Sequence, residues 1–394
     1  MEFLDYFELI VLPFLISLTA VWIIHPHLVK IAKIKDLVDN PNARKLQKEP
    51  VPILGGVAVF FGIFMSLSIA GILAECSELF VLLTSMLLML YLGTMDDILD
   101  LRAVTRLAVQ IGAALVLIYM GAGYKMNNLL GLWGITTIPD WIAVPLTVFA
   151  AVGIINATNL IDGVDGLSSG FGVMASIVCS VAFYFVGDYP MVILCASTVG
   201  AMTLFFLHNV FGKESKMFIG DGGTLVLGIV LAAYVTRLIN STHLLAPELL
   251  VNSSASVIPF TLAVLSIPVF DTLRVMSTRI LSGKSPFHPD KTHLHHMFID
   301  LGFSHVITTV TILSLNTLVI AIWAFAYLHG VSADMQTLIV VLTSVTATFG
   351  LYFCVQRFKY GNPDRYARLA AFIRARQPQR DGWFLVVQKI IDRI

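Results

Sequence analysis

The sequence predicts an all-α integral membrane protein with about eleven transmembrane helices. Composition supports this fold class, because 57% of the 394 residues are hydrophobic and only 13% are charged, against about 25% charged in an ordinary soluble domain. The apolar residues also form long runs, and about 20 apolar residues in a row can cross a bilayer as a helix. A soluble enzyme is excluded.

Each of the eleven runs is long enough to span a membrane. They lie at residues 8–29, 53–73, 79–95, 104–121, 141–157, 169–186, 190–208, 224–241, 257–276, 306–328 and 335–355. We expect the first run to stay in place as an anchor, because Met1 to Glu8 holds three acidic residues and no basic region of a cleavable signal peptide.

Basic residues are distributed unevenly between the two sides of the predicted bundle. The loops after odd-numbered runs and the C-terminal tail hold almost all Lys and Arg residues, whereas Lys125 and Arg237 fall on the other side. Loops rich in Lys and Arg remain in the cytoplasm. The N-terminus is therefore predicted to be outside, and the odd loops and the C-terminus cytoplasmic.

Residues 1–356 are predicted to form one polytopic domain, and residues 357–394 a cytoplasmic, basic, amphipathic tail. In this tail, basic residues alternate with aromatic ones such as Tyr366 and Trp383, which is typical of a segment at the membrane interface. A partner-binding segment is the alternative. The four cysteines have no CxxC spacing and lie in or beside apolar runs, so we interpret them as small buried hydrophobes.

Five aspartates stand in Gly-rich or charged breaks on the predicted cytoplasmic side. They are Asp96, Asp97, Asp162, Asp165 and Asp221. Carboxylates at the membrane are costly, and a chain that collects them at one interface usually holds a cation or a charged substrate. The sequence therefore indicates a magnesium-dependent site.

The first acidic break, Asp96-Asp97, follows the third run. Adjacent carboxylates repel each other, so this pair suits a divalent ion or cationic neighbours such as Arg102 and Arg106. If the helix continued, Asp100 would share a face with Asp96. A solvated acidic helix end is the alternative.

The second break, Asn156 to Leu167, contains two Asp-Gly pairs and two asparagines. The glycines permit unusual backbone geometry, and the helix expected next would offer its N-terminus to an anion. A simple turn would not need the asparagines. In the third break Asp221 stands between glycines, where an aspartate is usually an N-cap, but magnesium is typically held by one or two carboxylates plus substrate phosphates.

Two further segments suit phosphate binding. The stretch from Arg44 to Gly56 is basic and Pro-rich and ends in Gly-Gly, although a membrane flank is the alternative. Clustered histidines occupy the stretch from Ser285 to His296. Zinc is disfavoured there, because no cysteine is near and the spacing matches no standard zinc site; a plain polar loop is the other alternative.

At these residues the chain resembles the polyprenyl-phosphate N-acetylhexosamine-1-phosphate transferases, the glycosyltransferase 4 family. The shared motifs are RK…PxxGG at Arg44 to Gly56, DD at Asp96-Asp97, NxxNxxDGxDGL at Asn156 to Leu167, FxGDxG at Phe218 to Gly223, and HxHH at His293 to His296. The resemblance implies eleven transmembrane helices in the plasma (inner) membrane, a cytoplasmic active site, and transfer of a sugar-1-phosphate from a UDP-sugar to a lipid phosphate with release of UMP.

Within this family, PDKTHLHH resembles the branch that uses UDP-N-acetylglucosamine and undecaprenyl phosphate to start O-antigen, common-antigen or teichoic-acid linkage synthesis. Leu294 stands where the UDP-MurNAc-pentapeptide branch usually has a histidine, but that donor stays open as an alternative. Two residues depart from the usual motifs: Gln47 replaces a histidine, and Thr224 replaces a serine but keeps the hydroxyl.

Roles for individual residues follow from the resemblance. It implies that Asp221 is the principal ligand of Mg²⁺, or of Mn²⁺ in its place, and that Phe218 stacks on uracil. Catalytic roles fall to Asp96, Asp97, Asp162 and Asp165, whereas the groups that line the nucleotide pocket or hold phosphates are Lys48, Asn159, Asn209, Arg279, His293, His295 and His296. The implied partners are the UDP-sugar, the polyprenyl phosphate, membrane lipid and, by analogy, a second copy of the chain.

Two other classes of protein are less consistent with the sequence. A transporter or lipid flippase would place ionisable residues near mid-membrane in inverted repeats, and no repeat is evident. A CDP-alcohol phosphotransferase would need a DGxxAR motif, but Asp162-Gly163 is followed by Val164-Asp165. For the reaction, direct attack by the lipid phosphate is favoured over a covalent aspartyl intermediate, which stays open.

Overall fold

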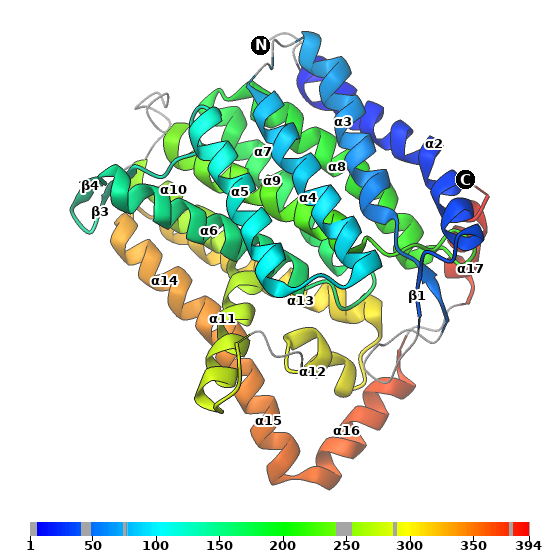
Figure 1. The fold of residues 1–394 in the computed structure, drawn as a ribbon. Coiled ribbons are helices and arrows are strands. Elements are labelled where there is room, and N and C mark those ends of the chain that lie inside the picture. The colour runs from blue at the N-terminus through cyan, green and yellow to red at the C-terminus, as the bar shows by residue number, and fades with distance from the viewer. Residues whose placement is uncertain are drawn as a thin grey trace.

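The computed structural model describes residues 6–40, 49–73, 76, 78–241, 254–286, 290–377 and 381–393. In this part of the chain, long helices pack into one bundle, accompanied by two short antiparallel strand pairs (Figure 1). Lys48, which is expected to hold phosphate, lies outside the described residues, as do Arg44, Gln47 and His288.

Ten described helices are long and apolar enough to cross a membrane, and a bent pair of helices gives an eleventh candidate span. The spans are Leu12–Ile34 (α2, preceded by a π-helical turn at Phe7–Val11), Gly55–Leu73 (α3), Leu79–Leu99 (α4), Ala103–Met120 (α5), Asp140–Leu160 (α6), Leu167–Val186 (α7), Tyr189–Phe211 (α8), Gly220–Ser241 (α9), Val257–Val264 (α10) with Ser266–Leu281 (α11), His305–Leu328 (α13), and Ala333–Val345 (α14) continued through Thr346–Gly350 into Leu351–Gly361 (α15). The all-α, multi-pass fold predicted from the sequence is confirmed.

The ninth span differs from the straight helix expected at residues 257–276. A short 3₁₀ turn, Ser254–Ser256, leads into α10, and α10 and α11 are bent by 65°. Pro268 has no N–H to donate to the carbonyl of Val264. The Asn316 side chain of α13 replaces the missing backbone hydrogen bond. Its Nδ2 donates to Val264 O (2.9 Å) and its Oδ1 accepts from Ile267 N–H (3.0 Å). These hydrogen bonds satisfy backbone groups at the break inside the bundle, which is required of backbone groups in a membrane.

Alternating helix directions bring all the acidic breaks to the same end of the bundle (Figure 1). We call it the site end; it contains the carboxyl ends of α2, α4, α6, α8, α11 and α15. The strand pair β1 (Val38–Asp39) and β2 (Val51–Pro52) also lies there. The hairpin of β3 (Asn128–Leu132) and β4 (Ile135–Thr137) joins α5 to α6 at the opposite end.

Three shorter helices cover the site end: Leu294–Asp300 (α12), Pro363–Ala375 (α16) and Trp383–Ile391 (α17). The expected domain boundary at residue 356 falls inside α15. The tail folds back onto the bundle, because the Tyr366 hydroxyl donates to Asp300 Oδ2 (2.7 Å) and the Phe384 ring lies 5.3 Å from that of Phe211. A membrane-interface role for the tail stays a prediction.

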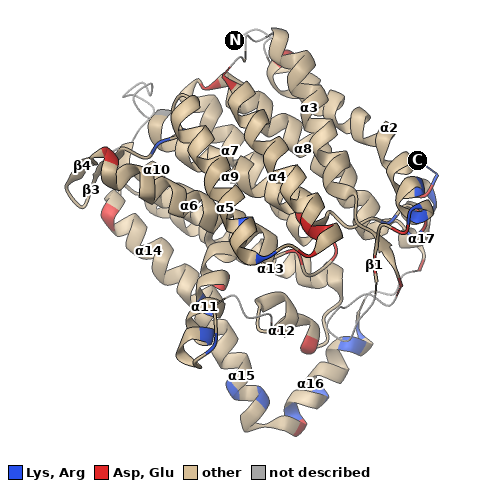
Figure 2. Cartoon of the chain, in the orientation of Figure 1, with Lys and Arg blue, Asp and Glu red and all other residues tan. Residues whose placement is uncertain are grey.

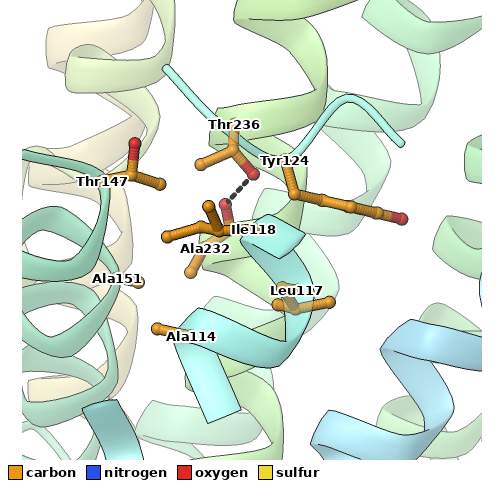
Figure 3. Close-up of a pocket in the computed structure, with 8 residues that line it drawn as sticks. All are labelled: Ala114, Leu117, Ile118, Tyr124, Thr147, Ala151, Ala232 and Thr236. Carbon is orange, nitrogen blue, oxygen red and sulfur yellow. Dashed lines mark hydrogen bonds between the residues drawn. The ribbon is translucent and has the colours of Figure 1, made fainter. Parts of the chain in front are cut away.

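A small pocket lies between α5, α6 and α9, away from the site end (Figure 3). Ala114, Leu117, Ile118, Tyr124, Thr147, Ala151, Ala232 and Thr236 line it. Thr236 Oγ1 donates to Ala232 O (2.9 Å), and Thr147 Oγ1 accepts from Met126 N–H (2.9 Å). Its lining includes no carboxylate and no histidine, so we interpret it as a packing gap.

Candidate active site

Asp97 of α4 caps the first turn of α9. Its carboxylate accepts the backbone N–H groups of Asp221 (3.1 Å) and Gly222 (3.4 Å), which are free at a helix N-terminus and favour an anion. The helices approach closely because Gly93 and Gly220 have no side chains: a Cβ on Gly220, at φ +66°, would lie 2.5 Å from Asp97 Oδ2. Two of the predicted carboxylates are thus side by side.

The Gly-Gly pair of the first loop packs against the same segment. Gly55 N–H donates to Phe218 O (3.0 Å) and Gly56 N–H to Ile219 O (2.8 Å). A Cβ on Gly56 would lie 2.2 Å from the backbone nitrogen of Gly223. We expected these glycines to let the backbone approach a phosphate. In the structure they let the first loop approach the start of α9.

The other aspartate of the pair, Asp96, faces α5. It accepts a hydrogen bond from Arg106 (2.6 Å) and from the N–H of Leu101 (2.8 Å). The cationic neighbour predicted for the acidic pair is therefore confirmed for Arg106. Asp100 does not join Asp96 on a helix face, because α4 ends at Leu99 and Asp100 takes a left-handed conformation with φ +50°.

Asn159, at the end of α6, holds Asp221 in place. Its Nδ2 donates to Asp221 Oδ1 (2.9 Å) and to Thr224 Oγ1 (2.9 Å). The Thr224 hydroxyl, which a serine would also provide, therefore accepts a hydrogen bond at the site. Asp221 Oδ2 lies 3.8 Å from Arg106 Nη1 and the side chain is one-third exposed, so the carboxylate group is open to solvent.

Asp162 lies shortly after Asn159, in the loop between α6 and α7. Ser168 donates to its Oδ1 (2.5 Å). Desolvation by the surrounding protein raises the pKa of Asp162 to about 6, an effect that the hydrogen bond from Ser168 opposes. The side chain also exposes more than a third of its surface, so solvent moderates this shift.

Asp165, by contrast, is buried and paired. Lys216 Nζ lies 2.7 Å from Asp165 Oδ2, and His305 Nδ1 lies 3.1 Å from the same oxygen. Burial alone would raise the pKa of Asp165, but the hydrogen bonds and charges of His305 and Lys216 outweigh it and lower the pKa. In this arrangement Asp165 joins three segments of the chain.

Asn209 is buried between two loops instead of facing open space. Its Oδ1 accepts from Gly166 N–H (2.7 Å) and its Nδ2 donates to Met217 O (2.9 Å). Phe218, one residue further on, is partly exposed, with Lys216 Nζ 5.7 Å from the centre of its ring. Asn209 therefore positions the segment that presents Phe218.

The histidine cluster packs against the Asp-Gly loop. The rings of His293 and His295 are stacked 5.7 Å apart, and those of His295 and His296 lie 4.3 Å apart. A Cβ on Gly163 would lie 2.0 Å from His295 Nε2. Burial lowers the pKa of His295 well below its usual value and that of His296 to about 4. At neutral pH these two rings are uncharged hydrogen-bonding groups.

Asp271 of α11 is a site residue that the sequence analysis missed. It is 3% exposed, lies 2.9 Å from His293 Nδ1 and accepts from Arg274 Nη2 (2.7 Å). Asp271 therefore fixes the His293 ring through Nδ1, and the buried Nε2 atom has no hydrogen-bond partner among the described residues. The sequence did contain a signal for Asp271, because an ionisable residue inside an apolar run often has a functional role.

Arg279, which we expected to hold phosphate, is paired with a carboxylate, and its role toward phosphate stays a prediction. It donates two hydrogen bonds to Asp290 (2.9 Å each) and one to Pro286 O (2.7 Å). This pairing, against the opposing effect of burial, lowers the pKa of Asp290. Both residues line an open pocket of about 400 Å³ that Tyr352 and Phe353 of α15 close on one side.

The carboxylates fit a magnesium ion that is only partly held by protein. In the described part of the chain, no three His, Cys, Asp or Glu side chains converge as metal ligands. The Asp221 side chain is nevertheless one-third exposed, Asp97 contacts the same helix start, and Asp96 binds the neighbouring Arg106. Magnesium characteristically takes one or two carboxylates and completes its shell with water and substrate phosphates.

Fold and site together define a polytopic membrane protein that assembles carboxylates, amides and histidines from separate loops at one end of a helical bundle. Residues 79–239 match the family described as glycosyl transferase family 4. A probable undecaprenyl-phosphate N-acetylglucosaminyl 1-phosphate transferase of Bacillus subtilis (strain 168) is 32% identical over 349 residues, 87% of each chain. The chain belongs to glycosyl transferase family 4, and the resemblance seen in the motifs is confirmed.

Two further relatives carry similar names. The undecaprenyl-phosphate alpha-N-acetylglucosaminyl 1-phosphate transferase of Escherichia coli (strain K12) is 28% identical over 335 residues, 83% of this chain and 86% of that protein. The decaprenyl-phosphate N-acetylglucosaminephosphotransferase of Mycolicibacterium smegmatis is 31% identical over 295 residues, 68% of this chain and 70% of that protein. These names share the sugar and differ in the prenyl chain.

Proposed function

We propose that this protein transfers N-acetylglucosamine-1-phosphate from UDP-N-acetylglucosamine to undecaprenyl phosphate and releases UMP, as the first membrane step of a cell-envelope polysaccharide. The names of all three relatives support the sugar, and two of them support the lipid. The observation that carries the proposal is the direct contact of Asp97, Asn159 and Asp221 from three separate motifs.

The chemistry joins two anions, so charge stabilisation is the main task. A phosphate monoester has its second pKa near ~6, and the lipid phosphate is therefore mostly ionised at neutral pH and needs little help from a base. Stabilising the oxygens of the transferring phosphoryl group is the larger requirement. Among the described residues, the cations Arg106 and Lys216 contact aspartates of the acidic breaks, Asp96 and Asp165.

Asp221 would hold Mg²⁺ at its partly exposed carboxylate, and the ion would supply charge neutralisation for the diphosphate. Asp97 accepts two backbone N–H groups of α9 and so fixes the position of Asp221. This arrangement supports direct attack by the lipid phosphate, with Asp97 as a positioning group, over a covalent aspartyl intermediate.

Phe218 would stack on the uracil ring, next to Lys216. His293, His295 and His296 would contact phosphate or sugar oxygens. Because His295 and His296 have lowered pKa values, they would act as neutral donors, and Arg106, Lys216 and the metal would supply the positive charge. Asp162 is accessible and adjacent to His295 through Gly163, which supports a place for it in the diphosphate pocket.

The site end would face the cytoplasm, where nucleotide sugars are soluble. Lys and Arg residues concentrate at that end, along α11, α15, α16 and α17 (Figure 2), and the positive-inside rule supports the orientation. The prenyl chain would remain in the bilayer while its phosphate reaches the carboxylates.

The test is transfer of label from UDP-N-acetylglucosamine into organic-extractable lipid by purified protein with undecaprenyl phosphate, with UMP measured in parallel. We expect equal amounts of labelled lipid and UMP, both abolished by EDTA and restored by Mg²⁺. UDP-MurNAc-pentapeptide is the competing donor, because only Leu294 in the PDKTHLHH motif speaks against that branch, which usually has a histidine at this position. Labelling with that donor alone would overturn the proposed sugar, and the absence of UMP with either donor would overturn the transferase itself.

A further inference from the structure

A carboxylate from the last helix occupies a ring of backbone donors in the loop between α8 and α9. Asp392 Oδ1 accepts the N–H groups of Lys213 (3.0 Å), Glu214 (3.1 Å) and Ser215 (3.1 Å), and the Ser215 hydroxyl (2.8 Å). Successive backbone N–H groups that point to one spot form an anion-binding concavity. These hydrogen bonds lower the pKa of Asp392 against the opposing effect of burial, so the side chain is ionised at neutral pH.

Two buried histidines hold the loop from its other side. His25 Nε2 lies 2.9 Å from Ser215 O, and His208 Nδ1 lies 3.0 Å from Ser215 Oγ. The two imidazole rings are stacked, with centres 4.0 Å apart. Ser215 is therefore fixed between α2 and α8 behind it and Asp392 in front.

The helix that carries Asp392 is itself anchored. Phe384 of α17 is buried, with its ring 5.3 Å from the ring of Phe211 at the end of α8, and Trp383 lies 6.1 Å from the same ring. Both ends of α17 thus contact the α8–α9 connection: its first turn through aromatic packing, and the residue after its last turn through Asp392.

The loop held by Asp392 leads directly into the candidate active site. Lys216, the next residue after Ser215, pairs with Asp165 (2.7 Å). Phe218 follows, with its N–H donated to Pro52 O (2.7 Å), and then Asp221. A shift of Ser215 would therefore move the cation and the aromatic ring assigned to the donor.

We infer that Asp392 is a positioning residue, which clamps residues 213–215 so that Lys216 and Phe218 stay in place for the nucleotide of the donor. The inference rests on the proposed function for the identity of the donor. The tail then supports the donor site from outside it.

The kinetic test compares Asp392→Asn and Asp392→Ala with Asp381→Ala, a control that removes an exposed aspartate from the same tail. We expect the KM for UDP-N-acetylglucosamine to rise about tenfold in Asp392→Ala, which corresponds to about 1.4 kcal/mol, and less in Asp392→Asn, whose Oδ1 still accepts hydrogen bonds. The KM for undecaprenyl phosphate should stay within about twofold, because the clamp acts on the donor side. An equal loss of kcat for all substrates, or unchanged kinetics, would contradict the inference.

Limited trypsin digestion provides a readout that does not depend on the donor. Asp392→Ala should release α17 and speed cleavage at Lys389 and in the loop at Lys213 and Lys216, whereas Asp381→Ala should match the wild type. Equal digestion of all three proteins would refute the clamp even if transfer activity were absent. A wild type that is inactive with UDP-N-acetylglucosamine but shows the digestion difference would overturn the proposed function and leave the clamp supported.

Discussion

Gly163 and His295 are in direct contact, and this contact joins the Asp-Gly loop to the histidine cluster. A Cβ at residue 163 would lie 2.0 Å from His295 Nε2, far inside any real contact distance. Either the ring or the loop that carries Asp162 must then move. The glycine of the Asp162-Gly163 pair is therefore needed for packing at the site as well as for the turn.

Gly163→Ala should reduce transfer activity by about 100-fold or more, because a misplacement of about 1 Å in a site costs that much. Gly153→Ala is the matched control, since a Cβ at Gly153 in α6 meets nothing within 4 Å; it should keep its activity. Initial rates of UMP release, at equal amounts of folded protein, provide the measurement. Full activity in Gly163→Ala would show that the contact is not required.

Single residues of the site were predictable where a motif carried them. Asp96, Asp97, Asn159 and Asp221 do meet at the same helix ends. Asp271 and His305 were not predicted, because their importance depends on contacts with His293 and Asp165 that are distant in the sequence. The pairing of Arg279 with Asp290 was likewise not predicted, because the resemblance assigned Arg279 to phosphate and the sequence does not indicate which carboxylate it contacts.

At the scale of elements, the loop between α8 and α9 is the segment on which the geometry of the site depends most. Lys216 connects it to the Asp-Gly loop through Asp165, Asn209 connects it to the start of α7, and Asp392 holds its outer side. Each connection uses a buried or partly buried polar group, so the loss of one leaves its partner unsatisfied.

Lys216→Met should destabilise the protein at pH 7 by about 2 kcal/mol, less than the ~3–5 kcal/mol for a fully buried pair, because Lys216 is 22% exposed. Lys213→Met, three residues earlier and exposed, should have little effect. The folded state lowers the pKa of Asp165, so its contribution is present above the ordinary aspartate pKa and is lost as the pH falls through the folded value. The difference between wild type and Lys216→Met should therefore shrink below about pH 4.

Denaturation of both variants in detergent, at neutral and acid pH, checks this expectation. A Lys216→Met protein as stable as Lys213→Met at pH 7 would mean that the pair with Asp165 contributes nothing to folding.

Hydrophobic runs predicted the existence of the spans, because eleven apolar segments of sufficient length are a strong signal. The break between α10 and α11 was not predicted, although Pro268 is visible in the sequence. A proline inside an apolar run can be tolerated or can bend the helix, and the outcome here depends on Asn316 of α13. The short strand pairs were missed because two to five residues give too little pattern.

At the scale of the whole molecule, the account depends on one orientation in the membrane. The site end carries the acidic breaks and nearly all basic residues, whereas the β3–β4 hairpin lies at the other end (Figures 1 and 2). The charge pattern predicted this separation of the two ends, and the structure shows that the helices bring the motifs to the same end. Which end faces the cytoplasm stays a prediction.

Single cysteines test the orientation in a variant whose four native cysteines are replaced. Ser282→Cys, exposed after α11, should be protected from a membrane-impermeant maleimide in intact cells and react after permeabilisation. Thr136→Cys, exposed in β4, should react in intact cells. The reverse pattern would place the carboxylates outside and would contradict a cytoplasmic donor.

The central claim is that the carboxylates gathered at the site end carry out sugar-phosphate transfer. Asp221→Asn tests it most directly, since it keeps the size of the side chain and the oxygen that Asn159 binds. Its control is Asp100→Asn, which removes an exposed aspartate from the same end at a left-handed position that asparagine tolerates. The measurement is transfer of label from UDP-N-acetylglucosamine to lipid at saturating Mg²⁺.

We predict that Asp221→Asn lowers transfer by roughly 100- to 1000-fold, the loss expected when a group that stabilises transition-state charge is removed, while Asp100→Asn retains nearly full activity. If Asp221→Asn, folded and present in equal amount, transferred label within a few-fold of the wild type, the carboxylate cluster would not be the catalytic site.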